Sequence, residues 1–230
     1  MSTTTYAPAN RAADTWAPAP RAMRLAAPIL LPLAPALVLV SGLVGVDDGT
    51  LSESELTAAV YAAPGQQSLS VWFGFLAALL LPIAAIWAGR PTYPRAPRLT
   101  TLAEVLLVPG YLCLSWLVAG SDAIMWYGAT NGLDPDLVTD MAWGVHPAFS
   151  VALGIFAVGH TLGTVLLGVA AIRSRAIPLW AGVALVVCQP IHFAVGIVSD
   201  PAVALGLNLV AYGLNVVAFG FLGWVIFRGR

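Results

Sequence analysis

Six long apolar segments, separated by shorter polar ones, run along this chain. They cover about residues 25–46, 68–89, 101–121, 148–172, 179–199 and 202–227. A helix needs about 20 predominantly apolar residues to cross the hydrocarbon core of a bilayer, and each segment is long enough. The pattern predicts an all-α membrane protein, a six-transmembrane-helix bundle within residues 25–230. Residues 1–24 are rich in Ala, Pro, Thr and Arg without apolar periodicity, which predicts a disordered cytoplasmic tail.

The charged residues divide into two groups along the chain. Arginines flank alternate ends of the apolar segments, at Arg21, Arg24, Arg90, Arg95, Arg98, Arg173, Arg175, Arg228 and Arg230. The remaining connections carry acids and no arginine, at Asp47, Asp48, Glu53, Glu55, Asp122, Asp134, Asp136, Asp140 and Asp200. Because cytoplasmic loops of membrane proteins carry the excess of arginine and lysine, this division predicts that both termini are cytoplasmic.

The connections on the acidic side contain helix-start signals. Ser52 and Glu55 form a capping-box pattern, which predicts a short outer helix over residues 53–62. Asp134 followed by proline predicts a second outer helix over residues 134–143 by the same reasoning. Asp200, also followed by proline, reads as the N-cap of the sixth segment after a tight turn.

The composition fits a lipid environment and excludes some functions. Of the 230 residues, 59% are hydrophobic and 9% are charged, whereas a soluble domain carries about 25% charged residues. The net charge of −1 removes a general attraction to nucleic acid, so no nucleic-acid partner is expected. All ten basic residues are arginine, which excludes a lysine nucleophile or Schiff base.

Polar side chains interrupt the apolar segments at similar depths. The run CQPIHF places Gln189 and His192 near the middle of the fifth segment, and His160 lies at the centre of the fourth. Polar residues inside a bilayer usually face the interior of the bundle, so we expect these side chains to converge. The candidate ligand-binding residues are Tyr111, Ser115, Trp116, His160, Thr164, Gln189, His192, Asn208, Tyr212 and Asn215.

Such residues have a purely structural interpretation as well. Buried His, Asn and Gln side chains often only join helices through hydrogen bonds, each contributing about 0.6 kcal/mol on average. Gly159 and Gly163 beside His160 also form a small-residue packing motif. The sequence leaves both interpretations open.

The leading functional hypothesis is a weakly polar, aromatic-walled pocket for an apolar lipid- or isoprenoid-like ligand. In its enzymatic version a carboxylic acid protonates the ligand, aromatic faces stabilise the carbocation, and the reaction is a cyclisation or isomerisation of the terpene-cyclase type. The candidate catalytic acids are Glu104, Asp122 and Asp200. No carboxylate falls at the predicted midplane.

Three alternatives stand beside this hypothesis. The chain could be a small carrier for a neutral solute, because an ion-coupled carrier usually has an acid at the midplane. It could hold a single b-type haem between His160 and His192, since imidazoles on facing helices suit haem iron. It could also be a structural membrane subunit. No metal site is predicted, because His146 lies too far from the other two histidines in depth. The sequence does not fix the oligomeric state.

A sequence run supports one further expectation. GHTLGTVLLGVAAIRSRAIPLWAGVALVVCQPIHF, residues 159–193, contains a mid-helix Gly-His, a short arginine loop, Pro-x-Trp-Ala and a histidine after Gln-Pro. It resembles a pattern in uncharacterised multi-helix integral membrane proteins of high-GC Gram-positive bacteria. The resemblance implies a multi-pass protein of a bacterial plasma membrane and implies no activity.

Overall fold

A computed structural model describes residues 19–47, 49–144 and 146–229, and these residues form helices and no strand. The helices are α1 (Arg21–Val44), α2 (Glu53–Ala62), α3 (Pro64–Gly89), α4 (Pro97–Leu117), α5 (Ala123–Asn131), α6 (Pro135–Trp143), α7 (Pro147–Ser174), α8 (Leu179–Val195) and α9 (Pro201–Phe227). A π-helical turn, Val118–Asp122, joins α4 to α5. Most of the predicted tail, residues 1–18, lies outside the described residues, but the first helix begins at Arg21, before the predicted boundary.

The prediction of an all-α, multi-pass membrane protein is confirmed. Within the described residues, five helices are long and apolar enough to cross a bilayer: α1, α3, the helix running from Pro97 to Asn131, α7 and α9. The predicted span 179–199 corresponds to α8, which is apolar but has only 17 residues. At 1.5 Å per residue it is about 25 Å long, slightly less than the hydrocarbon thickness of about 30 Å.

The predicted span 101–121 is the one whose boundaries changed most. Its helix begins at Pro97 and, instead of ending near residue 121, continues through the π-helical turn to Asn131. Hydropathy sets the length of the apolar core but not the point where a helix ends, and Gly132, with φ of 65°, ends this one in the left-handed conformation that glycine tolerates.

The long helices pack in a closed order. Each packs mainly against two neighbours, in the sequence α1, α3, α4, α7, α8, α9 and back to α1, and α3 also touches α9. Glycines allow the closest approaches: a Cβ atom on Gly159 of α7 would lie 2.5 Å from the Leu106 carbonyl oxygen of α4. A Cβ atom on Gly223 of α9 would lie 2.5 Å from the Ala27 carbonyl oxygen of α1. Small residues at such contacts are typical of membrane helices, which associate through close packing.

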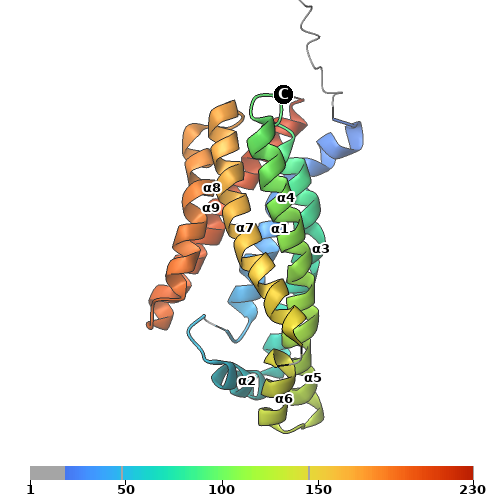
Figure 1. The fold of residues 1–230 in the computed structure, drawn as a ribbon, viewed down its shortest axis with the longest axis vertical. Helices are drawn as coiled ribbons and strands as arrows, with labels where there is room; N and C mark the ends of the chain where they lie inside the picture. Colours follow the sequence, from blue (N-terminus) through green and yellow to red (C-terminus); the bar gives the residue numbers. More distant parts are fainter. Residues whose placement is uncertain (1–18, 48, 145, 230) are drawn as a thin grey trace, which may run out of the picture.

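The helices α2, α5 and α6 form a small unit at one end of the bundle, which we call the cap (Figure 1). The cap has an apolar core of its own, made by Leu56, Val60, Met125, Val138 and Ala142. This core is separate from the main core, which the long helices share. In the cap, the two longest of the predicted loops therefore pack against each other.

Both short helices predicted in these loops are present. The Ser52 hydroxyl accepts from the Glu55 backbone N–H, and the Glu55 carboxylate accepts from the Ser52 N–H at 2.9 Å, which confirms the capping box. Hydrogen bonds from the Ser52 side chain and then its backbone hold the pKa of Glu55 below its usual range. Asp134 caps α6 by accepting from the Asp136 N–H at 3.1 Å.

The opposite end of the bundle carries the arginines. Figure 1 shows the start of α1, the α3–α4 and α7–α8 connections and the end of α9 together at this end, which we call the arginine end. Arg24 donates to the Phe227 carbonyl oxygen at 3.3 Å and Arg95 to the Ser174 carbonyl oxygen at 2.9 Å. These arginines thus satisfy free carbonyl groups at helix C-termini, where positive charge is also favoured by the helix dipole.

Candidate functional site

The two intramembrane histidines lie next to each other. The ring centroids of His160 on α7 and His192 on α8 are 6.2 Å apart, in an edge-to-face arrangement. His192 Nδ1 lies 2.9 Å from Asn208 Oδ1 of α9. Because an amide oxygen only accepts, Nδ1 carries the proton and Nε2 is an acceptor. The Tyr212 hydroxyl, 3.5 Å from Nε2, is placed to donate to it.

His160 is fixed by its own helix. Its Nδ1 donates to the Phe156 carbonyl oxygen at 2.7 Å, and its ring stacks on the Phe156 ring with centroids 4.4 Å apart. Thr164 donates to the His160 carbonyl oxygen at 2.6 Å. Tyr111 of α4 is also buried and lies beside Thr164. The α7 part of the cluster is therefore held rigidly inside the bundle.

Two buried amide side chains each have an oxygen atom that accepts no hydrogen bond within the described residues. Gln189 on α8 is 3% exposed and Asn215 on α9 is 5% exposed. Within the described residues, Gln189 Oε1 and Asn215 Oδ1 have no hydrogen-bond partner. An unpaired buried acceptor costs about 1–3 kcal/mol. These oxygens lie one helical turn deeper in the bundle than His192 and Tyr212.

The histidine pair does not fit a haem in this arrangement. A porphyrin needs a flat slot between two imidazoles whose Nε2 atoms face each other across the iron. Here the rings of His160 and His192 contact each other edge to face, and the Tyr212 hydroxyl occupies the Nε2 side of His192. No group of three His, Cys, Asp or Glu side chains among the described residues is placed to hold a metal ion.

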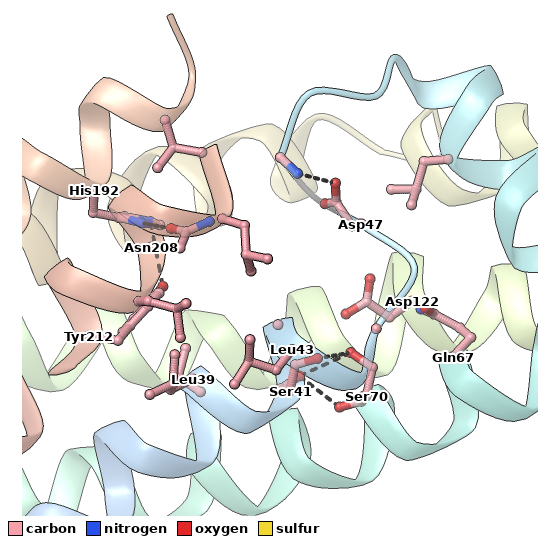
Figure 2. Close-up of a pocket in the computed structure, with 18 residues that line it drawn as sticks. Leu39, Ser41, Leu43, Asp47, Gln67, Ser70, Asp122, His192, Asn208 and Tyr212 are labelled. Atoms are coloured by element: carbon pink, nitrogen blue, oxygen red, sulfur yellow. Dashed lines mark hydrogen bonds between the residues drawn. The ribbon is translucent and has the colours of Figure 1, made fainter. Parts of the chain in front are cut away.

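A cavity of about 300 Å³ lies between this cluster and the cap (Figure 2). It is bounded by α1, α3, α8, α9, the α1–α2 loop, the first turn of α2 and the π-helical turn. One wall carries His192, Asn208 and Tyr212. The opposite wall carries Asp47, Gln67 and Asp122 with the hydrogen-bonded pair Ser41 and Ser70. Apolar side chains complete the lining, at Val38, Leu39, Leu43, Leu56, Val195, Leu205 and Leu209.

The three candidate acids lie in three different places. Asp122, at the end of the π-helical turn, is half-buried and lines the cavity. Such turns are frequent at functional sites. Glu104 packs against Gly89 of α3 toward the arginine end. Asp200 is exposed and caps α9, accepting from the N–H groups of Ala202 at 2.8 Å and Val203 at 3.2 Å. Neither Glu104 nor Asp200 lines the cavity.

The remaining candidates divide by burial. Trp116 is 55% exposed at the surface of α4, so it does not wall the interior, where the sequence placed it. Ser115 is half-buried one turn beyond Tyr111. Four polar residues of the cavity wall were missed by the sequence analysis: Ser41, Asp47, Gln67 and Ser70. The spacing of Gln67 and Ser70, three residues apart at the start of an apolar segment, is the signal that could have indicated one polar helix face.

Comparisons with known proteins do not identify a family for this chain. No family model matches the chain, and no significant match was found among curated proteins or solved structures. The residues that line the cavity are therefore what indicates its function.

Proposed function

We propose that this protein binds an amphipathic, lipid-like small molecule in the cavity between the histidine cluster and the cap. The observation that carries the proposal is the lining of that cavity. Apolar side chains from α1 and α9 adjoin two polar walls, one with His192 and one with Asp122. A mostly apolar lining with a few convergent polar groups is the usual composition of a small-molecule site.

The packing of the bundle favours binding over open passage. The polar lining occupies the half of the bundle near the cap. The other half contains the main apolar core, with large, fully buried side chains that include Leu107, Leu167, Phe219 and Leu222. A carrier would have to open this core, whose large buried side chains are apolar. This packing supports binding from one side.

Catalysis by acid-initiated cyclisation or isomerisation of an isoprenoid is the enzymatic version of this proposal. Asp122 is the one candidate acid that lines the cavity, so proton donation would fall to Asp122 and not to Glu104 or Asp200. The Tyr212 ring on the opposite wall would face a developing cation. This version adds a chemical step to the binding function and depends on it.

Filling the cavity should remove the ligand. Gly42 lines the cavity, and a Cβ atom placed there meets nothing within 4 Å, so the side chain of Gly42→Phe is accommodated at the cavity wall without a clash at Cβ. We expect mass spectrometry of lipid extracts from purified protein to show at least about a tenfold loss of the bound molecule, equivalent to about 1.4 kcal/mol.

A matched substitution controls for the new aromatic side chain. Gly154 of α7 also has nothing within 4 Å of its Cβ position and does not line the cavity. Gly154→Phe should keep the ligand content of the unmodified protein. If both variants lose the molecule equally, or if the unmodified protein carries no enriched molecule, the proposed function is wrong.

We also propose six membrane crossings, with α8 as the short one, and cytoplasmic termini in a bacterial plasma membrane. The support is the arrangement in which arginines gather at one end of the bundle and the acidic cap at the other. In intact cells, a membrane-impermeant maleimide should label Asp136→Cys in the cap and not Arg173→Cys at the end of α7. Labelling of Arg173→Cys alone would reverse the orientation, and the unmodified protein gives the background from its two cysteines.

A further inference from the structure

The charges on the cavity wall have one sign. Asp47 and Asp122 both line the cavity, and no arginine within the described ranges lines it. Figure 2 shows the two carboxylates on the same side of the cavity. Two carboxylates on one wall repel each other, and a cation between them relieves this repulsion. The wall is therefore electrostatically complementary to a cation.

A buried amide on the same wall also points to a ligand. Gln67 of α3 lines the cavity and is only 5% exposed. In Figure 2 its side chain points toward Asp122, and within the described residues no hydrogen bond of this side chain is present. Buried amides normally have hydrogen-bond partners. A bound polar group between Gln67 and the carboxylates would supply one.

The opposite wall adds no positive charge. It presents the aromatic rings of His192 and Tyr212, with the His192 Nδ1 proton already donated to Asn208. An aromatic face within about 6 Å attracts an ammonium group. A cation in the cavity would therefore lie between acidic groups on one side and rings on the other.

The apolar lining indicates where the rest of the ligand lies. Leu43 of α1 and Leu205 and Leu209 of α9 line the cavity and are also more than 40% exposed on the outside of the bundle. These side chains lie at the half of α1 and α9 away from the Ala27–Gly223 contact. A hydrocarbon chain in the cavity would therefore contact the apolar side chains of these two helices.

From these observations we infer that the ligand is a cationic amphiphile, whose ammonium group lies between Asp122, Asp47 and Gln67 and whose hydrocarbon part lies between α1 and α9. The inference rests on the proposed function and names the chemical class of its ligand. It is an alternative to the enzymatic version of that function, in which Asp122 is protonated and the ligand is a neutral isoprenoid. It also excludes anionic lipids, which two carboxylates would disfavour.

The test compares three probes of equal chain length on the full-length protein in dodecyl maltoside micelles. Titration calorimetry measures dodecylammonium, dodecanol and dodecanoate, with Gly42→Phe as the blank for partition into the micelle. The cavity-specific affinity for the ammonium probe should exceed that for dodecanol by about 10- to 100-fold, as expected for a charged hydrogen-bonding or ion-pairing group. In Asp122→Asn and in Asp47→Asn this preference should fall to within about threefold.

The contrary outcomes are distinct. If dodecanol or dodecanoate binds the cavity as tightly as the ammonium probe, the cationic assignment is wrong while the proposed function stands. If the ammonium preference survives in both asparagine variants, the assignment to these carboxylates is wrong. If no probe distinguishes the unmodified protein from Gly42→Phe, the inference fails, and the ligand content of the purified protein decides the proposed function separately. Unfolding temperatures without probe show that each variant is folded.

Discussion

Replacing Gly159 by alanine should lower the free energy of unfolding by about 3 kcal/mol. The new Cβ atom would lie 2.5 Å from the Leu106 carbonyl oxygen and 3.0 Å from Gly110 Cα. Both atoms belong to the backbone of α4, so no side-chain rotation can relieve the contact. The helices α4 and α7 must separate, and with them the neighbouring His160. Reversible unfolding in mixed micelles measures the change.

A second glycine on the same helix provides the control. Gly154 has nothing within 4 Å of its Cβ position. Gly154→Ala should leave the stability unchanged or raise it by up to about 1 kcal/mol, because alanine favours the helix more than glycine does. Equal effects of Gly154→Ala and Gly159→Ala would contradict the close backbone contact between α4 and α7.

The second large effect is expected at His192. His192→Leu removes the partner of Asn208 Oδ1 and of the Tyr212 hydroxyl, which leaves two polar groups without a bond. We expect a loss of about 1–2 kcal/mol in the same unfolding experiment, since hydrogen bonds between membrane helices contribute up to about 1.7 kcal/mol. The double variant His192→Leu/Asn208→Leu should be more stable than the sum of the two single variants predicts.

The double variant also distinguishes a purely structural role of the histidine cluster from a role in ligand binding. If the cluster only joins α8 to α9, the stable double variant should keep whatever molecule the protein carries. If His192 and Asn208 form a wall of the ligand cavity, the double variant should lose that molecule even where its stability is restored. Additive losses of stability in the cycle would show that His192 and Asn208 do not interact.

Several features were predictable from sequence because they depend on neighbours along the chain. The capping box at Ser52 and Glu55 and the N-caps at Asp134 and Asp200 need only a few consecutive residues. Long apolar runs require membrane helices whatever the packing, since the bilayer offers no partner for exposed backbone groups. The similar depths of His160 and His192 follow from counting residues along two helices joined by a short arginine loop.

Other predicted roles depended on which way a side chain points. Trp116 and Tyr111 lie on one apolar helix, yet Tyr111 is buried and Trp116 faces outward. Lipid is as apolar as the interior of the bundle, so the hydrophobic pattern does not tell the two faces apart. The sequence pattern also did not distinguish the surroundings of the predicted acids, because Asp122 lines the cavity while Glu104 packs against α3.

The sequence alone determined that the chain is helical, that it belongs in a membrane, where the capped helices begin, and that its charges divide into two groups. Only the tertiary structure decided that α9 packs on α1 and that Asp47, Gln67 and Asp122, from three separate segments, line one cavity opposite His192. Caps and apolar length act within a few turns of one helix, whereas the order of neighbours is set by backbone contacts between distant residues such as Gly223 and Ala27.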